Sequence, residues 1–274
     1  MNDKESILID IIKKLDSVVI GLSGGVDSTL TAKLCVDYLN AEKVWVVTGD
    51  SKSIMSEELE YCKELASWLE LPVDHFVIIN TDELDDPNYT ANPENRCYYC
   101  KHELFGKLTE FAEKIGAKHV IDGSNATDLT DYRPGMQAGR ELKVRAPLAE
   151  AGFTKEDIRS LAKKLGLPNW DKPAMPCLSS RIPYHSQVTP EKLDQVARAE
   201  RYLRSLGFRQ FRVRHHDKIA RIEVEDLELF LKNGLRERID RKLKEIGFTY
   251  VALDLGGFKS GNLNIDIKGR KFNG

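Results

Sequence analysis

The sequence predicts an α/β protein with a doubly wound parallel sheet and a smaller C-terminal α+β domain. Through the first 170 residues, short apolar stretches rich in β-branched residues alternate with amphipathic helical patterns. A helix between consecutive strands makes those strands parallel. Beyond residue 184 the pattern becomes helix, two consecutive strands, helix and a last strand. We therefore expect two domains, residues 1–184 and 185–274.

The elements of the first domain follow from periodicity and from end signals. The helix that opens at Thr154 has Asp157 in the capping-box position, and Ser56 is the expected cap of an earlier helix. In chain order we expect helix 5–15, strand 18–20, helix 28–38, strand 43–47, helix 56–69, strand 73–79, a helix that ends near 115, strand 118–121, a short strand 144–147 and helix 154–166.

Two prolines between residues 169 and 177 exclude a regular helix there, so this segment is expected to be a loop near the domain boundary. The second domain is then expected to contain helix 190–206, strands 210–214 and 219–224, helix 227–246 and strand 249–254.

The stretch from Ser23 to Ser28 lies between the first strand and the next helix, and it reads Ser-Gly-Gly-Val-Asp-Ser. Gly24 and Gly25 allow a tight turn and a close approach to a ligand, and a helix N-terminus is a ready anion site. The phosphate loops Gly-x-x-x-x-Gly-Lys-Ser/Thr and Gly-x-Gly-x-x-Gly are both absent here. The stretch instead resembles the PP-loop of ATP pyrophosphatases; the alternative is an ordinary glycine-containing turn.

That resemblance implies ATP as the ligand, with Asp27 holding Mg²⁺ and with Ser23 and Ser28 bonded to phosphate oxygens. Ser51 and Asn125 follow the second and fourth expected strands. The carboxyl ends of parallel strands form the ligand crevice of such sheets, so both residues are candidates for binding ATP.

Composition narrows the functional class. Forty-one basic and 43 acidic residues give a net charge of −2, which offers no electrostatic case for nucleic-acid binding. No apolar stretch is long enough for a membrane span, and the N-terminus does not read as a signal peptide. We therefore expect a cytoplasmic protein without disulfides, in which Cys35 and Cys62 pack in helices.

Cys97, Cys100 and Cys177 are different, because Cys97-x-x-Cys100 has the spacing of two ligands to one metal or cluster. Four interpretations remain open: a structural zinc site with His102 or His185 as a fourth ligand, a redox dithiol, plain packing, and an iron–sulfur cluster. Three thiolates can hold three irons of a [4Fe–4S] cluster and leave the fourth iron open.

Several motifs together resemble the LarE family of ATP-dependent sulfur transferases, and the resemblance covers nearly the whole chain. They are Ser23–Ser28, Arg96-Cys-Tyr-Tyr-Cys-Lys101, Asp122-Gly-Ser-Asn125, Trp170-Asp-Lys-Pro-Ala174, Pro176-Cys-Leu-Ser-Ser-Arg181, Arg212-x-Arg214 and Gly261-Asn-Leu-Asn264. In that family ATP adenylates a carboxylate of pyridinium-3,5-biscarboxylic acid mononucleotide, a nicotinic-acid-derived mononucleotide. Sulfur then displaces AMP, on the way to the nickel-pincer nucleotide of lactate racemase.

The resemblance also implies roles for single residues. Some family members sacrifice the sulfur of the cysteine that matches Cys177, whereas others, with two more cysteines, are thought to hold a [4Fe–4S] cluster. Because Cys97 and Cys100 are present, we expect the cluster with Cys177 as a ligand, and the sacrificial route is the alternative.

Arg212 and Arg214 flank one residue of an expected strand, so their side chains lie on the same face and suit the mononucleotide phosphate. The alternative is a solvated basic face. Ser180 and Arg181 are expected to position substrate, and Lys101 to stabilise developing negative charge. Asp128 either assists Mg²⁺ or caps a turn. For Glu200 and Glu223, a solvated surface position is preferred over a metal or inter-subunit site. The family is known to form hexamers, so a homo-oligomer is expected.

Three other functions compete with sulfur transfer to this mononucleotide. A PP-loop tRNA thiolase would need a basic surface or an RNA-binding domain, and neither is visible in the sequence. An ammonia-using ligase would not need Cys177. A non-catalytic nucleotide-binding module would release no pyrophosphate.

Overall fold

The structure is a computed structural model that describes residues 3–130, 134–173, 175–231, 234–259 and 262–264. It comprises two compact units, Met1–Asp86 with Asn95–Met175 and Pro87–Glu94 with Pro176–Gly274. The predicted division after residue 184 stays a prediction, because compactness does not by itself show which segments fold independently. Ala174 and Gly261, which stand in two of the motifs quoted above, lie outside the described residues.

The first unit contains a parallel four-stranded sheet in the order β3-β2-β1-β4. The strands are β1 (Val18–Gly21), β2 (Val44–Asp50), β3 (Phe76–Asn80) and β4 (His119–Ile121). Pairing is in register, with Val18 opposite Val44 on one side and opposite His119 on the other. The order reverses between β1 and β4, so the carboxyl end of β1 lies at the switch point where such sheets bind ligands.

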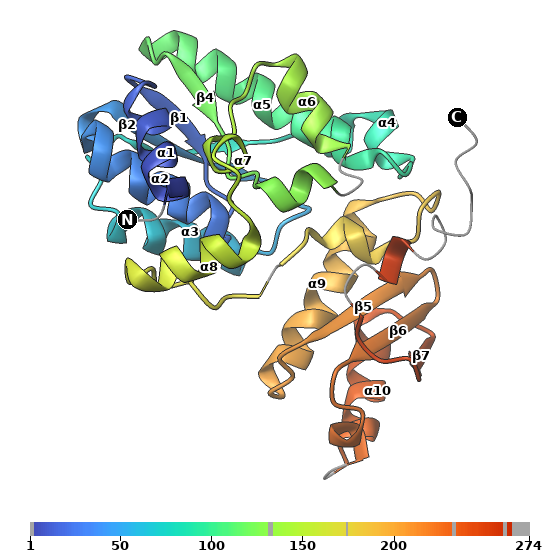
Figure 1. Ribbon diagram of the computed structural model, residues 1–274. Helices are drawn as coiled ribbons and strands as arrows, with labels where there is room; N and C mark the ends of the chain where they lie inside the picture. Colours follow the sequence, from blue (N-terminus) through green and yellow to red (C-terminus); the bar gives the residue numbers. More distant parts are fainter. Residues whose placement is uncertain (1–2, 131–133, 174, 232–233, 260–261, 265–274) are drawn as a thin grey trace. The chain divides into compact units, whose positions relative to one another are not determined.

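Helices cover both faces of this sheet, which confirms the predicted doubly wound class (Figure 1). Val18 and Ile20 pack in one core and Val19 in the other, as the two-residue period of a strand requires. The first core includes α1 (Asp3–Lys13), α2 (Val26–Leu39), α3 (Ser56–Trp68), α7 (Pro147–Glu150) and α8 (Lys155–Lys164). The second includes α5 (Arg96–Ile115) and α6 (Gly135–Glu141).

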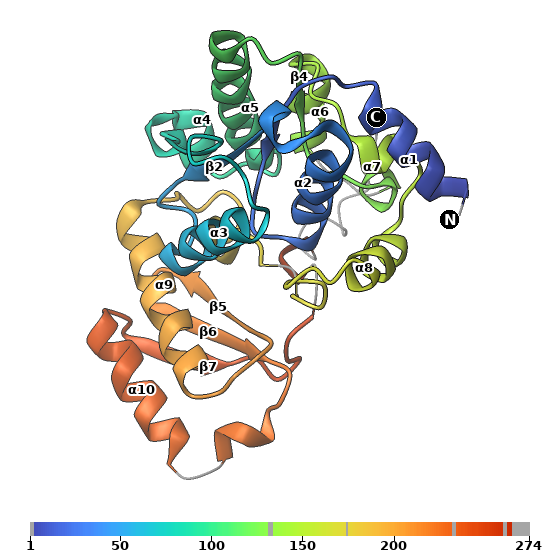
Figure 2. The same ribbon diagram turned by 90° about the vertical axis from the view of Figure 1, so that its left-hand side faces the viewer.

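The second unit is a three-stranded mixed sheet in the order β5-β6-β7 with α9 (Pro190–Ser205) and α10 (Leu235–Ile246). Strands β5 (Phe211–His216) and β6 (Ile219–Val224) are antiparallel, and β7 (Tyr250–Leu253) runs parallel to β6. One sheet face packs on both helices around an apolar core (Figure 2). The other face carries arginines and acidic residues. The short helix α4 (Pro87–Thr90) also belongs to this unit.

Most expected elements are present, and the exceptions have physical causes. Residues 144–147 form no strand, because only a single bridge joins Ile121 to Arg145, and Pro147 then opens α7. The expected helix 227–246 is a 3₁₀ turn (Glu228–Leu231) followed by α10. Gly234, with φ +65°, immediately precedes α10, and this backbone conformation interrupts a continuous helix.

Two smaller expectations at helix and strand starts were also wrong. Ser56 is the first residue of α3 and not its cap, since Met55 precedes it with extended backbone. Strand β3 begins at Phe76 and not at Val73, because pairing with β2 starts at Phe76 and the residues before it form a turn in which the His75 N–H donates to the Pro72 carbonyl oxygen. The capping box of Thr154 and Asp157 is confirmed. No helix in the described parts of the chain combines the length and apolar composition needed to cross a bilayer.

Candidate functional site

The loop after β1 has the conformation of an anion-binding turn. Gly24 has φ +73°, a left-handed conformation that favours glycine, and extended Gly25 caps α2 without a side chain. Ser28 donates its Oγ–H to the carbonyl oxygen of Gly25 at 3.1 Å and accepts from the Ser23 N–H at 3.2 Å. The two serine hydroxyls lie 3.2 Å apart, so the loop brings them together at the helix N-terminus.

Asp27, in the first turn of α2, is held by Asn125 from the loop after β4. The Asn125 Nδ2 group donates to Asp27 Oδ2 at 2.7 Å, and Asn125 is fully buried. Asn125 is itself fixed by Asp128, since each backbone N–H donates to the side-chain oxygen of the other. The carboxylate of Asp27 is thus oriented by an amide, and carboxylate oxygens are ligands that Mg²⁺ prefers.

Gly123 explains why the β4 loop can come so close to α2. A Cβ atom at this position would lie 2.6 Å from the Ser28 nitrogen and 2.8 Å from the Ser28 Cα atom. Only glycine fits there, because the atoms it would meet are backbone. The sequence analysis placed Gly123 in a motif but assigned it no role.

Lys101 and Ser51 lie at the carboxyl edge of the same sheet. Lys101, in α5, forms an ion pair with Asp122 at 3.1 Å, and Asp122 also accepts from the Ser124 hydroxyl. The Ser51 hydroxyl donates to Glu83, which is 2% exposed and also accepts from Ser53 at 2.8 Å. Glu83 was not singled out in the sequence, where it appears as one acidic loop residue among several.

The five cysteines fall into the two expected groups, two that are buried and three that are accessible. Cys35 and Cys62 are buried, and burial raises the pKa of the Cys62 thiol. Cys97 and Cys100 lie one turn apart at the start of α5, on one face of the helix, and both are accessible. Cys177 is partly exposed in the second unit, just before a 3₁₀ turn (Leu178–Arg181). Within the described ranges, no group of three or more His, Cys, Asp or Glu side chains is placed to hold a metal ion.

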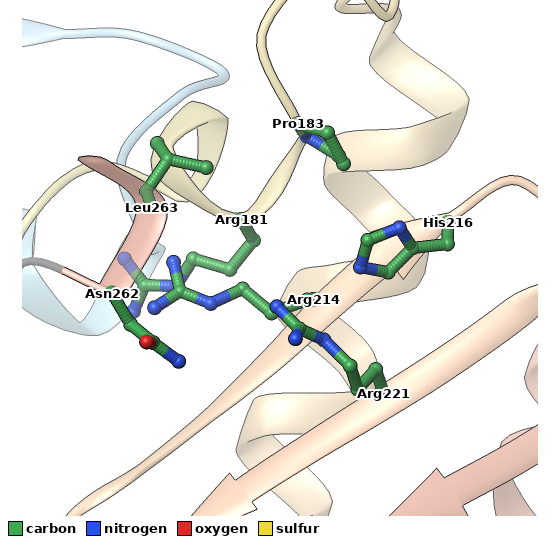
Figure 3. Close-up of a pocket in the computed structure, with 7 residues that line it drawn as sticks. All are labelled: Arg181, Pro183, Arg214, His216, Arg221, Asn262 and Leu263. Carbon is green, nitrogen blue, oxygen red and sulfur yellow. The ribbon is translucent and has the colours of Figure 1, made fainter. Parts of the chain in front are cut away.

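The polar face of the second unit holds a pocket of about 180 Å³ (Figure 3). The side chains of three arginines point into one region beside Asn262. The lining residues are Arg181, Pro183, Arg214, His216, Arg221, Asn262 and Leu263. Arg181 and Arg214 were predicted from the sequence as substrate residues, but Arg221 was not, although it lies directly opposite Arg214 in the pairing of β5 with β6. Antiparallel pairing of these two expected strands was the available signal.

Arg181 anchors the chain around Cys177. It is 1% exposed and donates to both carboxylate oxygens of Glu200, at 2.8 and 2.7 Å. Its remaining amino group donates to the carbonyl oxygens of Pro176 and Cys177 and to the Ser180 hydroxyl. Arg181 therefore holds the backbone that carries Cys177, and Ser180 joins the same network.

Glu223 is the acidic centre of the pocket wall. It is fully buried and accepts from Arg214 at 2.8 Å, from Arg221 at 3.2 Å and from Asn262 at 2.7 Å. The expectation that Glu200 and Glu223 are solvated was wrong, because each neutralises a buried or partly buried arginine.

Asp254 pairs with Arg221 at 3.0 Å, so three carboxylates (Glu200, Glu223 and Asp254) stand against four arginines when the neighbouring Arg212 is counted. Burial, followed by repulsion from Arg181, lowers the pKa of Arg212 to about 10. Arg212 does not line the pocket; its guanidinium lies 5.0 Å from the Phe258 ring centre. Among the described residues, the buried Nε–H groups of Arg214 and Arg221 have no acceptor. Unpaired buried donors in a basic pocket are suited to an anionic ligand.

Comparison with known proteins places this chain among PP-loop enzymes. The family model of NAD synthase matches residues 2–96. An uncharacterised protein of Synechocystis is 47% identical over 92% of this chain and 93% of the relative. The pyridinium-3,5-bisthiocarboxylic acid mononucleotide synthase of Lactiplantibacillus plantarum is 40% identical over 95% of this chain and 94% of the relative. A tRNA-specific 2-thiouridylase of Caldanaerobacter subterraneus is 29% identical over 57% of this chain and 52% of its own length.

Proposed function

Since this chain belongs to the LarE family of PP-loop enzymes, which includes the pyridinium-3,5-bisthiocarboxylic acid mononucleotide synthase, we propose that it transfers sulfur to a carboxylate of the pyridinium-3,5-biscarboxylic acid mononucleotide. The chain is an ATP-dependent enzyme of this family. The observation that carries the proposal is the loop Ser23–Ser28 with Asp27 oriented by Asn125. The end-to-end match to the synthase favours this substrate over tRNA, because the match to the thiouridylase covers only about half of each chain.

In the proposed reaction ATP binds with its phosphates at the N-terminus of α2. Asp27 would hold Mg²⁺, which neutralises phosphate charge far more than a helix terminus does. A substrate carboxylate oxygen attacks the α-phosphorus, and pyrophosphate leaves. Lys101, which pairs with Asp122 at 3.1 Å, would stabilise negative charge that develops at the carboxyl edge of the sheet. The acyl-adenylate then gives sulfur a good leaving group, AMP, which a free carboxylate lacks.

The substrate phosphate is assigned to the arginine pocket. Arg214 and Arg221 offer unpaired Nε–H donors there, and an incoming dianion would also relieve the repulsion that Arg212 experiences from Arg181. Arg181 and Ser180 would act on the reaction by positioning the backbone of Cys177. This assignment keeps Arg214 of the expected pair and adds Arg221, whereas Arg212 lies outside the pocket lining.

For the sulfur source we propose a [4Fe–4S] cluster held by Cys97, Cys100 and Cys177. The chemistry of the three residues suits a cluster, since all three thiols are accessible and Cys97 and Cys100 share a helix face, whereas a structural zinc site would need a fourth ligand. When bound, such a cluster would supply sulfide for transfer, and Cys177 would not be consumed. We also propose that the enzyme acts in the cytoplasm as a homo-oligomer.

The adenylation step is tested by pyrophosphate release from ATP with and without the mononucleotide. We expect release only with the substrate, and a loss of about 100-fold or more in Asp27→Ala, because Mg²⁺ loses its protein ligand. Asn125→Ala keeps the Asp27 carboxylate but removes the hydrogen bond that orients it, so the rate of pyrophosphate release should fall about 10- to 100-fold. Asp37→Ala, an exposed residue of the same helix that pairs with Lys33, is the control. Unchanged release in Asp27→Ala would contradict the assignment of the loop.

The sulfur source is tested separately, by measuring iron and acid-labile sulfide in protein purified without oxygen. The proposal expects about four of each per chain in the wild type and their loss in Cys97→Ala. Protein without iron that loses one sulfur by mass after reaction would establish Cys177 as a sacrificial donor instead.

A further inference from the structure

A distant segment of the first unit reaches back to the loop after β1. Asn169, which is 1% exposed, donates through Nδ2 to the Gly24 carbonyl oxygen at 3.2 Å and to the Thr29 hydroxyl at 2.9 Å. The Lys172 ammonium lies 3.4 Å from the same carbonyl oxygen. The expected loop around Trp170 thus contacts a turn about 150 positions earlier in the sequence.

The Lys172 ammonium is confined between this loop and α3. It lies 2.7 Å from Glu58 Oε2 and 4.0 Å from the centre of the Tyr61 ring. A Cβ atom at Gly24 would be only 3.6 Å from the ammonium. The side chain is 20% exposed, so its charge is partly desolvated and yet still reachable from solvent.

The loop itself lacks the cation that phosphate loops commonly carry, since no lysine follows its glycines. A triphosphate brings about four negative charges, and the helix terminus offers only about half a positive charge. Lys172, from a distant part of the chain, brings one further positive charge next to this loop.

We propose that Lys172 is the phosphate-binding lysine of this loop and contacts the β- and γ-phosphates of ATP. The inference rests on the proposed use of ATP at this loop. When the α-phosphorus is attacked, its bond to the bridging oxygen breaks, and the electron pair passes to pyrophosphate. Lys172 stabilises that charge. Without nucleotide, Glu58 is its partner, and the flexible lysine stem allows the ammonium to exchange the carboxylate for phosphate oxygens.

A purely structural role, in which Lys172 only supports the Gly24 carbonyl, predicts a different pattern. Loss of such a support would distort the loop and weaken the binding of every nucleotide. Asn169→Ala should have this same effect, because it removes the neighbouring contact to Gly24 without removing a charge. Loss of a phosphate ligand should spare AMP, because AMP lacks the β- and γ-phosphates.

The test is calorimetric binding of Mg-ATP, magnesium pyrophosphate and AMP to the full chain. In Lys172→Met we expect ATP and pyrophosphate to bind about tenfold weaker or more, and AMP to change less than about threefold. Lys172→Arg keeps the positive charge, so its dissociation constants for all three ligands should stay within about threefold of the wild-type values. Lys63→Met is the control, since Lys63 is on the same helix as Glu58 but pairs with Glu60 at the surface.

Glu58→Gln gives a second, opposite expectation. If Lys172 leaves Glu58 for phosphate, removal of that carboxylate should leave ATP binding unchanged or tighter. Equal losses of ATP and AMP in Lys172→Met, or weaker ATP binding in Glu58→Gln, would overturn the proposal. Wild-type protein that binds none of the three ligands would instead contradict the use of ATP at this loop, so the two failures are distinguishable.

Discussion

Replacing Gly123 by alanine should damage both stability and adenylation. The added Cβ would lie 2.6 Å from the Ser28 nitrogen, 2.8 Å from the Ser28 Cα atom and 2.9 Å from the Asp27 carbonyl carbon. An unstrained contact needs about 3.5 Å, so the β4 loop and the start of α2 must separate by about 0.6 to 0.9 Å. All three contacts are backbone atoms, which cannot rotate aside. We expect a loss of about 2–3 kcal/mol in the free energy of unfolding, at the upper end for an overpacked site.

The same displacement moves Asp27 and Ser28, the residues assigned to Mg²⁺ and phosphate. A shift near 1 Å at a reacting centre costs about 100-fold in rate, so pyrophosphate release should fall by about that factor. Urea unfolding gives the stability and a coupled pyrophosphate assay gives the rate. The control is Gly106→Ala: Gly106 lies inside α5 and a Cβ there meets nothing within 4 Å, so alanine should stabilise by about 0.5–1 kcal/mol. If Gly123→Ala unfolds like the wild type and releases pyrophosphate at the normal rate, the contact between the β4 loop and α2 does not position the site.

Two further predictions concern the second unit. Burial lowers the pKa of His215 to about 4, so the folded state favours the neutral ring, whereas the unfolded chain takes up its proton near pH 6.5. Stability is therefore fully present above pH 6.5 and should fall by on the order of 3 kcal/mol towards pH 4. In His215→Gln, the free energy of unfolding measured with urea should depend less on pH between 6.5 and 4. The same pH dependence as in the wild type would refute the attribution of this loss to His215. Arg181→Met leaves Glu200 buried and uncompensated and should cost about 3–5 kcal/mol by urea unfolding. In contrast, Arg236→Met, which breaks an exposed pair, should cost at most about 0.5 kcal/mol. Equal losses in the two arginine variants would contradict the buried ion pair.

Local patterns were sufficient for most of the fold. Short apolar stretches rich in β-branched residues identified β1 and β2, and the glycine turn between β1 and α2 was recognised because its residues are contiguous. The errors arose where a local pattern was ambiguous. A helical pattern continued across Gly234, whose positive φ interrupts it, and an extended stretch before Pro147 gained only one bridge to a neighbouring strand.

The sequence by itself determined the α/β class, the anion-binding loop and the candidate residues, because each depends on neighbours in the chain. Only the tertiary structure decided their partners. Glu200 and Glu223 look like surface acids until Arg181 and Arg214 are placed against them, and the hydrogen bond by which Asn125 orients Asp27 joins residues 98 positions apart. Likewise, a loop without a lysine receives one from a segment far along the chain. Burial and long-range pairing set the charge state and orientation of these side chains, and neither is encoded in local spacing.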